Sequence, residues 1–216
     1  MPTVMNFNTL IANLQSYLER GSSTVDPTVY AQLPFLINAA ERDIAKRLKI
    51  LGFLVPVNSV LVPGQPAYQK PSGWRQTVSM NYGAGTDSNV RTPILPRAYE
   101  YCRNYWPDDS QTAPPEYYAD YDYYDWLISP TPDQSYPWEI LYYQQPPLLD
   151  NVNTTNWLTN EAPMTLLYRA LLECTPYLKD DSRIQVWQSY FDSSIANLSG
   201  EEIQKIYDRT TTRKTD

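Results

Sequence analysis

Residues 116–129 read EYYADYDYYDWLIS, a stretch that fits either a ligand-binding site or a structural β-hairpin. The ten positions from Tyr117 to Trp126 hold five tyrosines, one tryptophan and three aspartates. Aromatic rings interleaved with carboxylates suit a carbohydrate-binding face or a glycosidase cleft, and they also suit a β-hairpin whose apolar side faces a core. The sequence on either side has to decide among these interpretations.

The stretch is expected to form part of a small sheet. Its two short runs, 116–120 and 124–129, meet near Asp122 and Tyr123, and a third run, WEILYYQ (138–144), follows a proline-rich segment. Strands linked by turns suggest a meander whose aromatic face packs on helices. The period of two places the following side chains on one face of the second and third runs: Tyr124, Trp126 and Ile128, and then Trp138, Ile140 and Tyr142.

Helical periodicity lies on both sides of this β-rich middle. Apolar residues recur at steps of three and four over 7–18, 37–51, 164–178 and 184–198. Pro34 is expected to interrupt the helix that begins near Pro27, and Pro176 to kink or end the third helix. Glu41 is expected to face outward beside the basic residues of its helix.

The predicted fold class is therefore α+β, an antiparallel helical bundle formed by the N- and C-terminal segments with a β-rich insertion between them. Residues 1–52 and 160–199 are assigned to the bundle and 53–159 to the insertion. A capping-box spacing at Ser199 and Glu202 predicts a further helix. With the polar tail it makes 200–216 a C-terminal helix and tail, which we interpret as a partner-binding arm.

Composition excludes several functions. The 216 residues carry a formal net charge of −7 and contain no histidine. An acidic chain of this kind does not grip nucleic-acid backbone, and the absence of histidine removes the usual triads and the commonest metal ligand. Cys102 and Cys174 fit no metal spacing and are expected to be reduced. We expect no catalytic residue, metal or cofactor, no membrane span and no standard secretion signal.

One alternative of a different class stays open. A carbohydrate-binding or hydrolytic tail-associated module could use the aromatic and acidic stretch 116–128, and its acids would be Asp120, Asp122, Asp125 and Glu139. These acids are expected on loop tips and on the outer sides of strands, where acids usually serve solubility. About half of the chain also looks helical, whereas carbohydrate-binding modules are usually all-β.

The order of segments resembles the head-to-tail adaptor, or connector, proteins of tailed bacteriophages, the group that includes the tail tubular protein A type. The resemblance extends over residues 7–208 and rests on the order and spacing of six phrases. They are INAAERDIAKRLK (37–49), QKPSGWRQTVSMNYG (69–83), TPILPRAYEYCRNYWPD (92–108), YYADYDYYDWLISPTPD (117–133), WEILYYQQPPLLD with NTTNWLTNEAP (138–163), and LLYRALLECTPYLKDDSRIQVWQSYFDSSIANL (166–198).

The resemblance implies a structural virion protein of the neck, made in the host cytoplasm. Such adaptors form a ring, typically of twelve copies, beneath the portal, where they extend the DNA channel and dock the tail. The implied partners are the portal protein, tail or neck proteins and further copies of the chain. Genomic DNA would pass through the acidic lumen without specific binding.

The resemblance also nominates residues for two contacts. The C-terminal segment of these adaptors commonly engages the portal, and aromatic residues of the β-rich part would be buried against a neighbouring subunit. The portal-binding candidates are Ile203, Ile206, Tyr207, Arg209, Arg213 and Lys214. The subunit-interface candidates are Tyr117, Tyr121, Tyr123 and Trp138.

Overall fold

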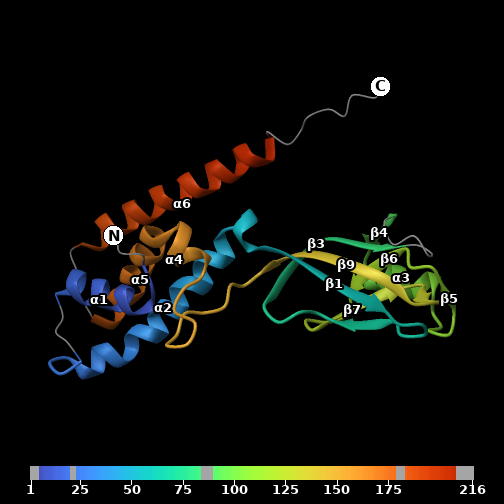
Figure 1. Ribbon diagram of the computed structural model, residues 1–216, viewed down its shortest axis with the longest axis horizontal. Helices are drawn as coiled ribbons and strands as arrows, with labels where there is room; N and C mark the ends of the chain where they lie inside the picture. The colour runs from blue at the N-terminus through green and yellow to red at the C-terminus, as the bar shows by residue number, and fades with distance from the viewer. Residues whose placement is uncertain (1–4, 20–22, 84–89, 179–182, 208–216) are drawn as a thin grey trace. The chain divides into compact units, whose positions relative to one another are not determined.

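The computed structural model describes residues 5–19, 23–83, 90–178 and 183–207. The chain divides into two compact units. The helical unit comprises Met1–Phe53 and Gln145–Asp216, and the β unit comprises Leu54–Gln144. Figure 1 labels the helices and strands of both units. Each unit has its own buried side chains and is described separately below.

The helical unit is built around α5. Helices α1, α2, α4 and α6 all contact α5. Asn6 begins α1 and Asn156 begins α4 through capping boxes with Thr9 and Thr159, while a proline in the first turn begins α2. The elements are α1 (Phe7–Leu18), α2 (Pro27–Arg47), the 3-10 helix η1 (Leu51–Phe53), α4 (Trp157–Glu161), α5 (Pro163–Leu178) and α6 (Ile184–Tyr207).

Pro34 did not have the effect that the sequence predicted. Helix α2 continues through Pro34, whereas α5 ends at Leu178, shortly after Pro176. A proline inside a helix removes one backbone hydrogen bond, but buried neighbours can hold the helix together. Leu33, Leu36 and Ile37 surround Pro34 in sequence and are all buried, so tertiary packing outweighs the local defect. The capping-box spacing at Ser199 and Glu202 does not begin a separate helix, because α6 runs on through Gly200 as one helix to Tyr207.

The β unit contains a seven-stranded mixed sheet in the order β1-β9-β3-β4-β6-β7-β2. Strands β4 and β6 are parallel and are connected through helix α3, whereas the other pairs in this sheet are antiparallel. The elements are β1 (Leu54–Leu61), β2 (Ala67–Gln69), β3 (Trp74–Gly83), β4 (Arg91–Pro96), α3 (Tyr99–Tyr105), β5 (Thr112–Ala113), β6 (Tyr117–Asp120), β7 (Asp125–Ser129), β8 (Thr131–Pro132) and β9 (Tyr136–Gln144).

This sheet overturns the predicted fold class. The protein is a mixed α/β protein with a curled seven-stranded sheet, and the prediction of a helical bundle carrying a β-rich insertion is wrong. The predicted meander is wrong for the same reason. Strand β9 does not follow β7 in the sheet but lies between β1 and β3, with Ile140 opposite Val57 on one side and Met80 on the other.

The aromatic face of the sheet packs on itself. The sequence had predicted that this face would pack on helices, and the structure differs on this point. Because the sheet curls, its inner face encloses a core of rings and aliphatic side chains. In this core Trp138 makes edge contacts with Tyr68 and Trp126. Its buried members are Leu61, Tyr68, Met80, Tyr82, Ile94, Tyr118, Trp126, Ile128, Tyr136, Trp138, Ile140 and Tyr142. On β7 and β9, Trp126, Ile128, Trp138, Ile140 and Tyr142 therefore do share an inner face, whereas Tyr124 lies outside β7 and is exposed.

Helix α3 covers a second small core on the other side of β6 and β7. There Cys102 of the helix packs with Ala119 and Leu127 of the strands. Cys102 is an unpaired buried thiol, and Cys174, in the helical unit, is one too. That both cysteines are reduced stays a prediction.

Candidate functional site

The opening stretch of the sequence folds into the β6–β7 hairpin, whose tip is fixed by its own aspartate. The Asp122 carboxylate oxygen Oδ1 accepts hydrogen bonds from the backbone N–H groups of Tyr124 at 2.6 Å and Asp125 at 2.7 Å. An aspartate that bonds the backbone two and three residues ahead stabilises a turn. The turn leaves Tyr123 and Tyr124 with 72% and 67% of their surface exposed.

Lys70, at the end of β2, ties this hairpin tip to the sheet. Its ammonium lies 2.8 Å from Asp120 Oδ1 and donates to the carbonyl oxygen of Asp122 at 2.7 Å. It also lies 4.0 Å from the ring centroid of Trp74, within reach of a cation–π interaction. The side chain is only 3% exposed, so these partners replace the water that the charge has lost.

Removing the charge of Asp120 is predicted to destabilise the protein more than removing that of its partner Lys70. Asp120→Asn should lower the free energy of unfolding by about 2 kcal/mol, because it leaves a buried ammonium short of a counter-charge. Lys70→Met should cost less, since the remaining carboxylate is 64% exposed and can be hydrated. Adding Lys70→Met to Asp120→Asn should recover stability. Urea denaturation of the four chains measures the coupling, and equal losses from the two single changes would contradict this account.

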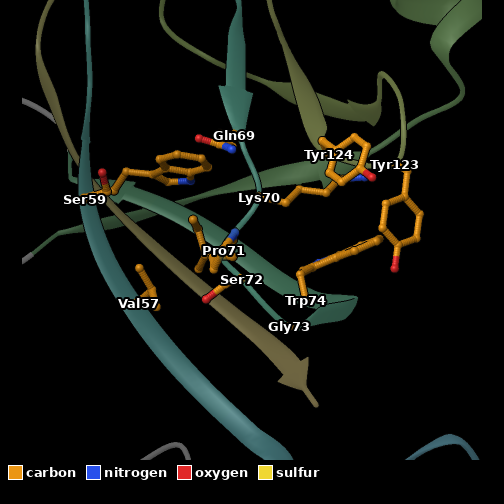
Figure 2. A pocket seen from close by; sticks show the side chains of 12 residues that line it. Val57, Ser59, Gln69, Lys70, Pro71, Ser72, Gly73, Trp74, Tyr123 and Tyr124 are labelled. Atoms are coloured by element: carbon orange, nitrogen blue, oxygen red, sulfur yellow. The ribbon is translucent and has the colours of Figure 1, made fainter. Parts of the chain in front are cut away.

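Beside Lys70 the β unit has a pocket of about 550 Å³. Figure 2 shows Lys70 extending toward an aromatic wall formed by Trp74, Tyr123 and Tyr124. Strands β1 and β9 contribute further lining residues, among them Trp138. Within the described part of the chain, the buried Nε1 of Trp138 has no hydrogen-bond acceptor. A volume of this size falls in the range of small-ligand and peptide side-chain sites.

A second aromatic surface lies over α3. Tyr101 contacts Tyr105 and Tyr117 at ring-centroid distances of 4.6 and 5.5 Å. The guanidinium of Arg97 lies over the rings of Tyr101 and Tyr117 at 5.5 and 5.3 Å. Tyr121 joins this surface at 5.7 Å from Tyr99 and is half-exposed. Arginine with tyrosine is a composition enriched at the centres of protein interfaces.

The structure separates the four subunit-interface candidates. Tyr117 is half-buried in the α3 surface, Tyr121 lies at the edge of that surface, and Tyr123 faces the pocket. Trp138 is 3% exposed and packs inside the core of its own β unit, so it has almost no surface to offer a neighbouring subunit. The sequence pattern could not distinguish an inward aromatic residue from an outward one at a site where both faces are aromatic.

The portal-binding candidates lie at the far end of α6 and beyond it. Ile203, Ile206 and Tyr207 belong to the last turns of the helix. Arg209, Arg213 and Lys214 lie outside the described residues.

Three of the four acids of the hydrolase alternative have structural partners. Asp120 pairs with Lys70, Asp122 holds the turn, and Glu139 lies 3.5 Å from Arg91. Burial raises the pKa of the Tyr118 phenol, and the Asp120 carboxylate adds to this effect, so the phenol stays protonated at neutral pH.

Over the described ranges, no group of three or more cysteine, aspartate or glutamate side chains could hold a metal ion. Nor is any helix in those ranges long and apolar enough to cross a membrane.

Sequence reasoning missed Lys70, Trp74 and Glu41. Lys70 is the single lysine between 54 and 144, and it stands directly before Pro-Ser-Gly-Trp, which is the signal that could have found it. Glu41, predicted to face outward, is 1% exposed. It follows Ile37 by four residues and precedes Ile44 by three, so its spacing already placed it on the buried stripe.

The comparisons with known proteins bear on identity. No curated protein matches the chain. The family model of the SU10 adaptor protein matches residues 5–214, which covers both units. This match supports the phage adaptor type that the sequence resembled, though not the narrower assignment to the tail tubular protein A type. The chain belongs to the SU10 adaptor protein family.

Proposed function

We propose that this protein is a structural component of the virion neck, a head-to-tail adaptor that forms a ring beneath the portal, extends the DNA channel and docks the tail. The observation that carries the proposal is the family match over residues 5–214, because it includes both units and the greater part of the C-terminal segment. No catalytic role is needed for this function, and the Asp120 and Asp122 carboxylates have structural partners.

The charge of the chain suits a channel. At −7 per chain, a ring of twelve copies is strongly acidic. DNA moving through an acidic lumen is repelled and does not adhere, so it can pass without specific binding.

The α3 surface suits contact between neighbouring subunits. A closed ring needs two different patches on each copy, one for each neighbour. Tyr117 and Tyr121 are assigned to one of them, together with the α3 rings that they contact. Aromatic rings with an arginine stacked on them bury a large area at low cost in side-chain entropy.

The C-terminal segment is proposed to engage the portal. Ile203, Ile206 and Tyr207 would supply apolar contacts, and Arg209, Arg213 and Lys214 would pair with acids of the portal.

Sedimentation with the portal ring of the same virus tests the function. The portal peak is expected to gain the mass of many 25.0 kDa subunits when the adaptor is added. A chain lacking residues 200–216 should keep its far-ultraviolet circular dichroism per residue but fail to shift the portal peak. A full-length chain that sediments alone beside the portal would contradict the adaptor function. A truncated chain that still binds would contradict only the role of the arm.

A further inference from the structure

A second cavity of the β unit, of about 400 Å³, lies where the sheet divides. Strand β4 pairs with β3 only at the far end of β3, over 80–83. The last residues of β4, Leu95 and Pro96, pair with β6 instead. The cavity lies between the two strands where β4 no longer joins them, and its lining includes residues 74–77 of β3 and 118–120 of β6. We call this cavity the β3–β6 slot.

One side of the slot is an unpaired strand edge. Over 74–79, β3 pairs with β9 on one side, and in the described part of the chain no strand pairs with its other side. A free edge presents backbone N–H and C=O groups to which a further extended segment can bond. Folded proteins usually cover or block such edges, so a free edge that lines a cavity favours an added strand as the occupant.

Two arginines line the slot. Arg97 follows β4 directly, and its backbone N–H donates to the carbonyl oxygen of Tyr118 at 2.9 Å, which fixes its position. The guanidinium of Arg97 lies over the rings of Tyr101 and Tyr117, and no ion pair within the described ranges includes it. Arg75 stands at a shift in the register between β3 and β9, and irregularities of this kind re-aim a side chain.

The slot is electropositive although the chain is acidic. Among the described residues that line it, Asp120 alone is acidic, and the ammonium of Lys70 lies 2.8 Å from its carboxylate. Lys70, Arg75 and Arg97 therefore set three cations against one carboxylate. In a chain with a net charge of −7, this local reversal of sign attracts acidic groups.

We propose that the β3–β6 slot binds an extended acidic segment of a partner protein, which adds a strand to the free edge of β3 and places a carboxylate between Arg75 and Arg97. Guanidinium groups bind carboxylates through paired N–H donors, so the arginines recognise the side chains while the strand edge holds the backbone. DNA phosphates would also be attracted to the arginines, but a duplex has no peptide backbone to pair with a strand edge. The site lies wholly within the β unit, so the proposal does not rest on ring formation or on portal binding.

Fluorescence anisotropy with the full-length protein tests the charge preference. The probe is a fluorescein-labelled octapeptide that alternates threonine with glutamate, because threonine favours an extended strand. The comparison peptide has lysine in place of every glutamate. We expect saturable binding of the glutamate peptide and binding about tenfold weaker, or less, for the lysine peptide. Absence of saturable binding of the glutamate peptide at millimolar protein would overturn the proposal, and so would equal binding of the two peptides.

Three arginine variants locate the site. Arg97→Gln and Arg75→Gln should each weaken binding of the glutamate peptide about fivefold. Arg91→Gln is the matched control, because Arg91 is an exposed arginine of the same unit that does not line the slot. Equal weakening by Arg91→Gln and Arg97→Gln would overturn the location, since only the overall charge would then matter. Arg97→Glu should in addition shift the preference toward the lysine peptide, a result that loss of folding cannot produce.

Two backbone-methylated peptides test the strand pairing. One carries N-methyl groups on its threonines and the other on its glutamates, so each lacks N–H donors along one edge of the strand. Because only one edge of an added strand faces β3, one of these peptides should bind about tenfold more weakly than the other. Equal binding of the two methylated peptides would overturn the addition of a strand to β3.

A DNA titration decides between the two kinds of anion. A fluorescein-labelled duplex replaces the peptide at about 0.15 M salt, where contacts with phosphates are partly screened. We expect no saturable binding of the duplex. Saturable binding that Arg97→Gln abolishes would overturn the peptide proposal in favour of a phosphate site.

Discussion

Replacing Glu41 with alanine is expected to lower the free energy of unfolding by about 3 kcal/mol at pH 5. Glu41 reaches from α2 to the segment that leads into α4. Its Oε2 accepts from the backbone N–H of Leu149 at 3.0 Å, and its Oε1 accepts from the side chain of Asn156 at 2.5 Å. Alanine would leave the N–H of Leu149 without its acceptor, would leave the Asn156 amide only its longer bond to the Pro147 carbonyl, and would open a cavity. Urea denaturation followed by circular dichroism measures the loss.

The pH dependence of this effect follows from burial. Desolvation raises the pKa of Glu41 from 4.5 to about 7, although the hydrogen bonds from Leu149 and Asn156 act in the opposite direction. The pKa is higher in the folded state than in the unfolded chain. The stabilising contribution is therefore fully present below about pH 4.5 and is lost as the pH rises through about 7. A pKa difference of this size between the folded and unfolded states lowers the free energy of unfolding by about 3 kcal/mol across that pH window.

Glu41→Gln tests the pH dependence, since glutamine has nearly the same shape and cannot ionise. The stability of the wild type should fall relative to that of Glu41→Gln between pH 5 and pH 8. Glu161→Gln is the control, because Glu161 is an exposed glutamate of the same unit. If the wild type and Glu41→Gln kept parallel stability curves over this range, the carboxyl of Glu41 would not be the titrating group.

The sequence predicts the helices of this fold but not the arrangement of its sheet. The helical stripes were recognisable because apolar residues at steps of three and four have one simple explanation. The place of β9 was not, because Ile140 pairs with Val57 and Met80 at separations of more than fifty residues. Nothing in a local pattern specifies such a register. Without it, the curl of the sheet and the enclosure of Trp138 cannot be predicted.

The candidate site was predictable only in part. The hairpin and its exposed Tyr121 and Tyr123 follow from a local turn motif, in which Asp122 bonds the residues ahead of it. The role of Lys70 depends on Asp122 across 52 positions, and that of Glu41 depends on Leu149 across 108. Single-sequence reasoning assigns a charged residue to the surface because most of them are there. Both exceptions are stabilised by partners that only the folded chain brings close.

Replacing Gly52 with alanine is expected to cost about 3 kcal/mol of folding free energy, near the upper end for overpacking. A Cβ on Gly52 would lie 2.2 Å from Cε2 of the Trp157 ring, where no side chain can be accommodated. The ring cannot move away easily. Trp157 is the first residue of α4, directly after the Asn156 cap, and it packs edge-on against Phe53 at 5.3 Å. Glycine is thus needed here for the close approach of the indole to the backbone.

The partner change and a second glycine make this test specific. Trp157→Leu removes the obstructing ring, so Gly52→Ala should cost at least about 1 kcal/mol less in that background than in the wild type. Gly200→Ala is the matched control, because a Cβ on Gly200 in α6 meets nothing within 4 Å. There the same substitution should stabilise the helix by roughly 0.5–1 kcal/mol. If Gly52→Ala cost the same with and without the Trp157 ring, the loss would arise from the backbone of η1 and not from the contact with the indole.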